Sequence, residues 1–585
     1  MDLHSFYMGE VFDAYEFFGA HTDFNGTVFR TYAPSAYRVN IMGDWTGWQE
    51  VEMQRSGQLY TYYSADAHVG HMYKYVIYSG AGRAEHTDPY AFAMELRPAC
   101  ASIVTDLMAY RFTDHKWMRD RSKNYDSPMN IYELHMGSWK CGSDRVNGWY
   151  TYTDIADELI EYVKSHGYTH IEFMPLAEHP ADESWGYQNT GFFAPTARYG
   201  TPLQLMELVD RCHNAGIGCI MDFIPVHFAC DPYALEKYDG SALYEYPSQD
   251  VGVSEWGTYN FIHSRREVCC FIQSAADMWL SLYHFDGLRM DAISRAIYWQ
   301  GDPARGVNSS TVDFLRRMDE GLHRRHPTAM LIAEDSTDMP KITAPTEFGG
   351  LGFDYKWDLG WMHDTLDYMA LPPSERERER AKITFSMYYF SNELYLLPLS
   401  HDENVHGKKT IIDKMWGGYD DKFRQVKTLY MYMYTHPGKK LLFMGSEFGQ
   451  FREWDVHREQ DWSLMEYETH RTLDGYMTDL CGLYRDRRSL YCEEYDARRF
   501  EWCDPVCEGS GEAASGAGAV FAYRRTSGDE STVVLLNFSD REQTVTFEAG
   551  KLTLLLATDP EQRGEDSTKG IVLPPLSGAM FDEKN

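Results

Sequence analysis

The sequence predicts a multidomain protein with a central (β/α)₈ TIM barrel between an N-terminal and a C-terminal β-sandwich. Three observations support this fold class. The 585 residues are too many for one compact domain. Apolar strand-like runs alternate with amphipathic helical patterns from about residue 128, and alternating strand patterns occupy both ends of the chain. We therefore expect domains at 1–112, 113–488 and 489–585.

The N-terminal segment contains short alternating stretches separated by Gly, Pro and Asn. TVFRTYAPSAYRVNIMGDWTGWQ and YTYYSADAHVGHMYKYVIY are the clearest of these stretches, and their period of two is typical of antiparallel strands. Trp45, Trp48 and Tyr75 lie within them. These rings are either sugar-stacking residues or core residues, and the pattern alone does not distinguish the two.

Eight strand candidates follow, and most of them are nearly continuous apolar runs, as expected for strands buried on both faces. They are NIYELHMG (130–137), THIEFMPL (169–176), GCIMDFIPV (218–226), GLRMDAI (287–293), MLIAEDS (330–336), GFDYKW (352–357), YLLPLSHD (395–402) and KLLFMGSEF (440–448). Helical patterns such as 153–167 and 201–216 lie between them, each ending in Gly.

A closed barrel explains these strands better than an open doubly wound sheet. Polar residues follow nearly every strand, as an active site built from the βα loops of a barrel requires. The longest insertion, about 227–263, follows the third strand and is rich in Tyr, Asp and Gly. Strand patterns return after about 488, and GSGEAASGAGA (509–519) among them predicts a flexible loop.

The composition limits the classes of partner and ligand that the protein is expected to bind. A formal net charge of −33 argues against nucleic acid and anionic membranes as partners. The 42 Tyr and 15 Trp suit a flat, hydroxyl-rich neutral ligand, or aromatic-rich cores. Eleven cysteines without zinc spacing indicate free thiols in a reducing compartment. The beginning MDLHSFYMGE has no signal-peptide pattern and no long apolar run occurs, so we expect a cytoplasmic protein.

The stretch FDGLRMDAIS (285–294) carries an arginine and an aspartate two residues apart. On a strand, Arg289 and Asp291 point to the same face. The cation favours the ionised carboxylate, which is the state of a nucleophile or an electrostatic stabiliser. A structural ion pair is the alternative for this stretch taken alone.

Four strand ends together supply carboxylates, histidines and an arginine. They contribute Asp222 and His227, Arg289 and Asp291, Glu334, and His401 and Asp402. This is the inventory of a retaining glycosidase. Asp291 beside Arg289 suits the nucleophile, and Glu334 after the apolar run LIA suits an acid/base with a raised pKa. Asp402 is left to stabilise the transition state. A metal site lacks ligand spacing such as HExxH, so we expect no metal and no cofactor.

DFIPVH, GLRMDAI, AED and LSHD resemble the four sequence blocks of the α-amylase superfamily, in the same order. Longer segments resemble bacterial 1,4-α-glucan (glycogen) branching enzymes, and the resemblance covers most of 130–465. These segments are SWGYQNTGFFAPTARYGTP, DGSALYEYP, EWGTYNF, GLGFDYKWDLGWMHDTLDYM, LSHDENVHGK and HPGKKLLFMGSEFGQFREW. The N-terminal sandwich resembles the carbohydrate-binding module of such enzymes.

The resemblance implies Asp291 as nucleophile, Glu334 as proton donor and Asp402 as transition-state stabiliser. It adds Tyr187 as a ring stacked on the sugar next to the scissile bond. Asp222, His227, Arg289 and His401 are implied as further sugar contacts. Two positions depart from the expected pattern: AEDS stands for AEES and GFF for GYY, at Asp335 and Phe192. These departures affect chain-length preference and leave every catalytic position intact.

The sequence therefore predicts a transglycosylase that cleaves an α-1,4-glucan and forms α-1,6 branches. Two alternatives remain: an α-glucan hydrolase, such as an amylase or a debranching enzyme, and a glycogen-binding scaffold with a dead site. The residues alone lead as far as a retaining double displacement, and the preference for branching comes from the resemblance. We expect an α-glucan partner, a monomer, and Asp291 and Glu334 carboxyl groups roughly 5 to 5.5 Å apart.

Overall fold

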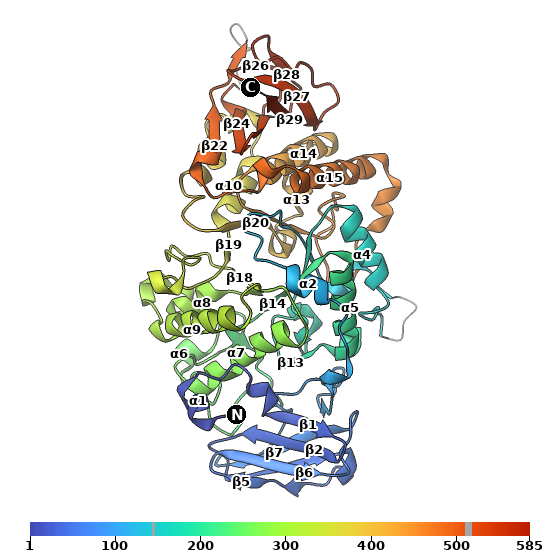
Figure 1. The fold of residues 1–585 in the computed structure, drawn as a ribbon, viewed down its shortest axis with the longest axis vertical. Helices are drawn as coiled ribbons and strands as arrows, with labels where there is room; N and C mark the ends of the chain where they lie inside the picture. The colour runs from blue at the N-terminus through green and yellow to red at the C-terminus, as the bar shows by residue number, and fades with distance from the viewer. Residues whose placement is uncertain (143–146, 509–516, 585) are drawn as a thin grey trace. The chain divides into compact units, whose positions relative to one another are not determined.

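The computed structural model describes residues 1–142, 147–508 and 517–584 (Figure 1). Its residues cluster into two compact units. The first comprises Met1–Ser122, His135–Leu159 and Glu172–Asp354, and the second comprises Lys123–Leu134, Ile160–Ile171 and Tyr355–Asn585. Most of the predicted loop 509–519 lies outside the described residues.

All eight predicted barrel strands are present, and they form one closed barrel in chain order. They are β10 (Asn130–Leu134), β11 (His170–Phe173), β14 (Gly218–Phe223), β17 (Gly287–Met290), β18 (Met330–Ala333), β19 (Tyr355–Trp357), β20 (Tyr395–Leu399) and β21 (Lys439–Phe443). The pairings β14 with β17, β17 with β18, β19 with β20 and β20 with β21 are parallel. The predicted barrel is confirmed. Asp222 and Arg289 lie inside β14 and β17, whereas Asp291, Glu334 and Asp402 lie in the loops that follow β17, β18 and β20.

The two predicted helices are also confirmed. Within 153–167 lies α4 (Ala156–Ser165), and 201–216 contains α5 (Pro202–Ala215). The latter begins with a capping box at Thr201 and ends at Gly216, whose left-handed backbone favours glycine. The other longer helices are α7 (Arg266–Ser281), α9 (Ser309–Arg325), α10 (Leu359–Ala370), α14 (Tyr419–Thr435) and α15 (Glu468–Asp486). Shorter helices are α1 (Leu3–Met8), α2 (His115–Asp120), α3 (Met136–Trp139), α6 (Gln249–Gly252), α8 (Ile293–Ile297), α11 (Pro373–Arg376), α12 (Ala381–Thr384) and α13 (Ile411–Lys414).

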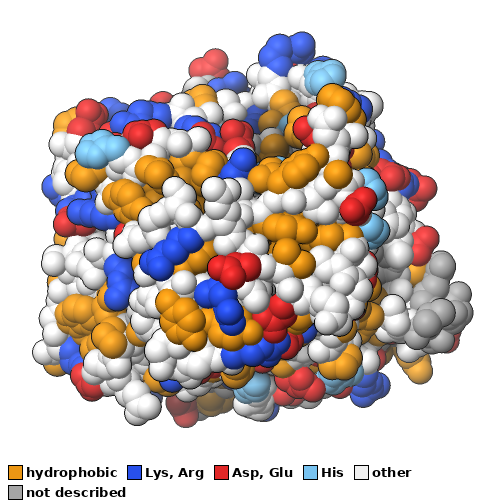
Figure 2. All heavy atoms as spheres, turned by 90° about the horizontal axis from the view of Figure 1, so that it is seen from below, with side chains coloured by type: hydrophobic (Ala, Val, Ile, Leu, Met, Phe, Trp, Pro, Cys, Tyr) orange, Lys and Arg blue, Asp and Glu red, His pale blue; other side chains and the backbone are white. Residues whose placement is uncertain are grey.

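The N-terminal segment forms two antiparallel sheets, as its alternating pattern predicts. One has the order β1 (Gly19–Asp23), β2 (Gly26–Tyr32), β6 (Leu59–Ser64), β5 (Gln54–Ser56). The other has the order β4 (Val51–Glu52), β3 (Arg38–Gly43), β7 (Met72–Ser79), β8 (Gly82–His86), with β9 (Ser102–Ile103) also on β7. Figure 2 shows the face of the molecule that lies at the bottom of Figure 1, where apolar side chains form separate patches among charged ones.

The three N-terminal rings have different environments. Tyr75 is a core residue, because it is fully buried and its hydroxyl donates to Asp88. Trp45 stacks on Phe29 at 4.9 Å, so it belongs mainly to the same interior. Trp48 is exposed and donates to Asp44. Of the three, Trp48 is the exposed one, Trp45 is partly buried and Tyr75 is fully buried.

The insertion after the third barrel strand is ordered around a short ladder. Its first and last strands, β15 (His227–Phe228) and β16 (Tyr259–Asn260), pair antiparallel, and α6 lies between them. Strands β12 (Ala177–Glu178) and β13 (Gly191–Pro195) form a second short ladder earlier in the same unit. Between these two strands lies Tyr187.

The C-terminal segment forms two sheets around a core of its own, as predicted. The larger has the order β22 (Phe500–Cys503), β24 (Val520–Ser527), β25 (Glu530–Asn537), β29 (Ser577–Lys584), β27 (Lys551–Ala557). The smaller has the order β23 (Val506–Glu508), β26 (Gln543–Thr546), β28 (Ile571–Leu573). Apolar side chains from both, including Val533, Val545 and Leu573, pack together.

Candidate active site

Arg289 and Asp291 form the contact that their spacing predicts. Arg289 is the third residue of β17, is buried, and donates from Nη1 to Oδ1 of Asp291 at 2.8 Å. Asp291 directly follows the strand, and its backbone N–H donates to the carbonyl of Phe223 on β14. The next residue, Ala292, has a left-handed backbone with φ of 48°. Such a conformation is costly for alanine and is typical of functional sites.

The same guanidinium group contacts two further carboxylates. Its Nη1 donates to both oxygens of Asp222 at 2.7 Å, because Asp222 lies opposite Arg289 in the register of β14 and β17. Its Nη2 donates to Oε2 of Glu334 at 2.9 Å, and the backbone N–H of Ala292 donates to that same oxygen. Arg289 therefore joins carboxylates from three neighbouring strands: Asp222 within β14, and Asp291 and Glu334 directly after β17 and β18.

Asp222 and Arg289 both have pKa values shifted from their ordinary values. Burial raises the pKa of Asp222 to about 7, the charge of Asp291 adds to the shift, and Arg289 opposes it. Burial also disfavours the charge of Arg289, but the surrounding carboxylates outweigh it and hold its pKa well above the ordinary value. Asp222 is therefore the carboxyl group of this cluster that favours a proton near neutral pH.

Tyr187 and His227 border this cluster. The hydroxyl of Tyr187 donates to Oδ2 of Asp222 at 2.6 Å, and the ring centroid lies 5.9 Å from the guanidinium carbon of Arg289. The buried His227 lies with Nε2 3.7 Å from Oδ2 of Asp291. All six predicted site residues of the first unit are therefore brought together.

His401 and Asp402 of the second unit follow β20. The Nδ1 atom of His401 lies 2.6 Å from Oε1 of Glu133, and its backbone N–H donates to Oε2 of the same side chain at 2.9 Å. Nε2 of His401 lies 3.7 Å from Oδ1 of Asp402, whose side chain is 50% exposed. Asp402 thus presents its carboxylate to solvent beside a firmly held imidazole.

Sequence reasoning missed two residues beside these groups. Glu133 lies in β10 and is 1% exposed, and a charged residue inside the apolar run NIYELHMG was the signal. Trp256 of the insertion packs its ring 5.1 Å from that of His227. The segment EWGTYNF carries it, but no pattern in the sequence places that segment beside His227.

Over residues 1–142, 147–508 and 517–584, no group of three or more His, Cys, Asp or Glu side chains is arranged to hold a metal ion. None of the helices within these ranges combines the length and the apolar character that a membrane span requires.

Comparison with known proteins matches three parts of the chain to described families. Residues 17–91 match carbohydrate-binding module 48 (isoamylase N-terminal domain), and residues 145–250 match the alpha amylase catalytic domain. Residues 507–580 match a domain of unknown function, DUF3459.

Curated relatives match over nearly the whole chain. The 1,4-alpha-glucan branching enzyme GlgB of Bacillus caldolyticus is 44% identical over 92% of this chain and 82% of its own length. The GlgB enzyme of Geobacillus stearothermophilus is 42% identical over 92% of this chain and 85% of its own length.

Solved structures share the fold at low sequence identity. The pullulanase of Paenibacillus barengoltzii in complex with maltohexaose and alpha-cyclodextrin has a TM-score of 0.78 at 17% identity, covering 99% of this chain and 97% of that one. A putative alpha amylase from Salmonella typhimurium has a TM-score of 0.74 at 17% identity, covering 97% and 100%.

The barrel, its flanking sheets and the arginine-centred carboxylates define a protein of the α-amylase type. Within that class the identity to curated relatives decides the family. The chain belongs to the 1,4-alpha-glucan branching enzymes.

Proposed function

We propose that this protein cleaves an α-1,4-glucan and transfers the released segment to a 6-hydroxyl of another glucan, forming an α-1,6 branch. One observation carries the chemistry. Arg289 hydrogen-bonds Asp291 and Glu334 with two nitrogens of a single guanidinium group. A nucleophile and an acid/base of a retaining enzyme must flank one glycosidic bond, and a shared rigid fork keeps both carboxyl groups at that bond.

The first step forms a glycosyl-enzyme. An oxygen of Asp291 bonds to the anomeric carbon as the bond from that carbon to the glycosidic oxygen breaks. Glu334 gives its proton to the departing oxygen, which leaves as the 4-hydroxyl of the remaining chain.

The second step transfers the segment. Glu334, now ionised, takes the proton of an incoming 6-hydroxyl, whose oxygen bonds to the anomeric carbon and releases Asp291. The configuration at that carbon is retained because it is inverted twice. Arg289 keeps Asp291 ionised between turnovers.

Asp402 is proposed as the transition-state stabiliser. It follows β20 as Asp291 follows β17, and the C-terminal ends of strands in a closed parallel barrel share one face. We propose Tyr187 as the ring stacked on the sugar at the scissile bond. Asp222, His227, Arg289 and His401 are the proposed hydrogen-bonding contacts to that sugar.

The proposal is tested with amylose and an iodine stain. The expected result is a fall and blue shift of the iodine complex, new α-1,6 linkages by proton NMR, and few new reducing ends. Accumulation of free maltodextrins instead would assign the hydrolase alternative. Asp291→Asn should fold normally and lose about four orders of magnitude of activity. An active wild type beside an inert Asp291→Asn variant excludes the dead scaffold.

We further propose that the domains divide at 112/113 and 488/489, that the protein is a cytoplasmic monomer, and that it needs no cofactor. The antiparallel sheets within 19–103 and 500–584 support the two boundaries. The charge of −33 supports a neutral glucan rather than a polyanion as partner.

A further inference from the structure

An exposed indole ring lies beside the proposed nucleophile. Trp256 is 44% exposed, although large aromatic side chains contribute most when they are buried. Its ring centroid lies 5.1 Å from that of His227, and Nε2 of His227 lies 3.7 Å from Oδ2 of Asp291. One imidazole ring therefore separates an exposed tryptophan from the reacting carboxylate.

The ring is held by contacts on the segment that carries it. The guanidinium carbon of Arg295 lies 5.6 Å from the ring centroid, and Nη2 of Arg295 forms an ion pair with Glu255 at 2.5 Å. The backbone N–H of Trp256 donates to the hydroxyl of Ser254. These contacts restrict the conformation of the Trp256 side chain before a ligand binds. The entropy lost on binding is therefore smaller.

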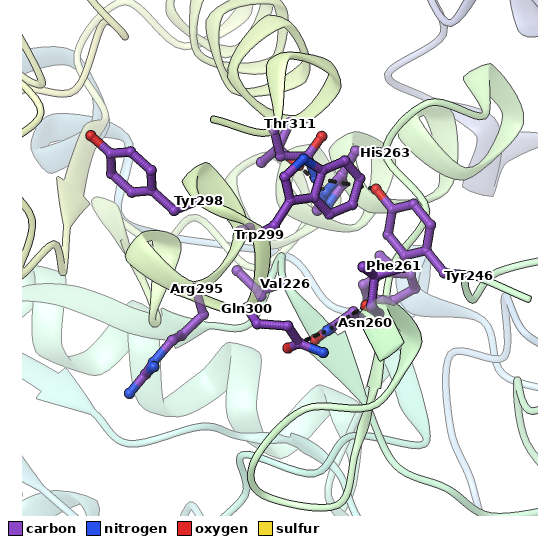
Figure 3. Close-up of a pocket in the computed structure, with 13 residues that line it drawn as sticks. Val226, Tyr246, Asn260, Phe261, His263, Arg295, Tyr298, Trp299, Gln300 and Thr311 are labelled. Carbon is purple, nitrogen blue, oxygen red and sulfur yellow. Dashed lines mark hydrogen bonds between the residues drawn. The ribbon is translucent and has the colours of Figure 1, made fainter. Parts of the chain in front are cut away.

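Gln300, in the loop that follows Asp291, hydrogen-bonds to the insertion that carries Trp256. Its side-chain amide donates to the carbonyls of Asp250 and Val253 at 2.8 Å each. Gln300 has a left-handed backbone with φ of 59°, a strained conformation that these bonds help to maintain. Figure 3 shows Gln300 reaching Asn260 of β16, while the Arg295 side chain extends away from the other lining side chains.

The pocket in Figure 3 is itself too small for a sugar. Tyr246, Trp299 and Asn308 are among its lining residues, and the space open to water in it is about 10 Å³, room for about one water molecule. A glucosyl unit would therefore lie on the exposed ring of Trp256, outside this pocket. The pocket lies where the insertion packs against the loop that follows β17.

Arg295 connects the Trp256 ring to the proposed acid/base Glu334. The backbone N–H of Ala292 donates to Glu334, and the backbone N–H of Arg295 donates to the carbonyl of Ala292. The backbone of Arg295 is thus linked through Ala292 to the acid/base, and its side chain contacts the Trp256 ring. The departing and incoming glucan chains must both meet that acid/base.

We propose that Trp256 is a stacking platform for the acceptor glucan and favours transfer to sugar over transfer to water. The apolar face of a pyranose ring covers an indole well, and a covered indole excludes water from the glycosyl-enzyme. This inference rests on the proposed transglycosylation and names what selects its acceptor. Hydrolysis needs no such platform, because water requires no aromatic surface.

The test compares branching with reducing-end release in Trp256→Ala and Trp256→Phe. Trp256→Ala should lower branch formation on amylose at least tenfold, while reducing-end release falls less than about threefold, so the hydrolysed share rises. Trp256→Phe keeps an apolar ring and should be intermediate. Phe348→Ala removes another exposed ring, 66% accessible, and should change neither activity.

Three outcomes would overturn the inference. In the first, branching and hydrolysis fall by the same factor in both Trp256 variants. In the second, the ratio of branching to hydrolysis in Trp256→Ala equals that of wild type. In the third, Trp256→Ala is as active in branching as wild type. A thermal melt of Trp256→Phe separates a folding defect from a lost acceptor. Failure of the proposed function itself would appear differently, as Asp291→Asn retaining activity or as a wild type that only releases maltodextrins.

Discussion

Glu133 holds His401 with both of its carboxylate oxygens, one on the ring Nδ1 and one on the backbone N–H. Both residues are buried. Because a carboxylate accepts the Nδ1 proton, it sets the tautomer and orientation of the ring, and Nε2 points toward the Asp402 side. Glu133 is therefore a positioning residue for the proposed sugar contact.

We expect Glu133→Gln to lower kcat about ten- to one-hundredfold, because a hydrogen bond to a charged group contributes about 1.5–3 kcal/mol. Branching rates measured from pH 5 to 9 with purified protein check this loss across the kcat profile. The control is Glu583→Gln, which removes another buried glutamate that accepts from Arg524 and Gly550. It should lower the melting temperature and leave the kcat profile unchanged; a matching profile for both variants contradicts positioning.

Arg289→Lys keeps the charge and loses the fork that joins Asp222, Asp291 and Glu334. We expect a loss of at least about a hundredfold in kcat/KM, because at least two charge-assisted hydrogen bonds disappear and a lysine cannot replace them geometrically. Stability should fall as well, since carboxylates in a buried cluster lose partners. Steady-state kinetics and thermal unfolding measure the two effects. Arg524→Lys, whose arginine forks to Glu583 in the C-terminal sandwich, should affect stability alone.

Tyr187 combines a ring and a hydroxyl, and two variants separate their effects. Tyr187→Phe removes the 2.6 Å hydrogen bond to Asp222 and should lower kcat about tenfold. Tyr187→Ala also removes the proposed stacking ring and should lower kcat/KM at least a further tenfold. Kinetics on maltooligosaccharides of defined length check this order. Equal activities for the two variants would mean that the ring makes no contact with sugar.

A buried histidine away from the catalytic cluster predicts how stability depends on pH. His213 lies with Nδ1 2.8 Å from Asp114 and Nε2 2.9 Å from Asp286. Burial opposes its charge, but Asp286 and Asp114 outweigh burial and raise the pKa of His213 to about 9. An unfolded histidine has a pKa near 6.5, so the charged form contributes about 3 kcal/mol below about pH 6.5, and this contribution disappears as pH rises through about 9.

Thermal or urea unfolding of wild type and His213→Gln between pH 6 and 10 measures this contribution. The difference in unfolding free energy should be largest at pH 6 and shrink by pH 10. A difference that stays constant over this range would mean that His213 is uncharged in the folded protein. Branching activity at a fixed pH should change little in His213→Gln, because the residue contacts none of the proposed catalytic groups.

The sequence by itself determined the architecture to a large extent. Buried parallel strands are nearly continuous apolar runs, so eight such runs with helical patterns between them specify a barrel without coordinates. The Arg289 and Asp291 contact was also readable, since residues two apart on a strand point the same way. Strand ends were overextended, because polar residues at a barrel mouth continue the strand pattern into loops.

Only the tertiary structure decided which distant residues meet. The fork of Arg289 reaches Asp222 and Glu334 through the register of neighbouring strands, which no local pattern states. Glu133 and Trp256 were missed for the same reason. Glu133 contacts His401, although the two are 268 positions apart in the chain, and Trp256 packs on His227 from within a long insertion. Periodicity records which face a side chain occupies, whereas contacts between elements depend on packing geometry that the chain acquires only when it folds.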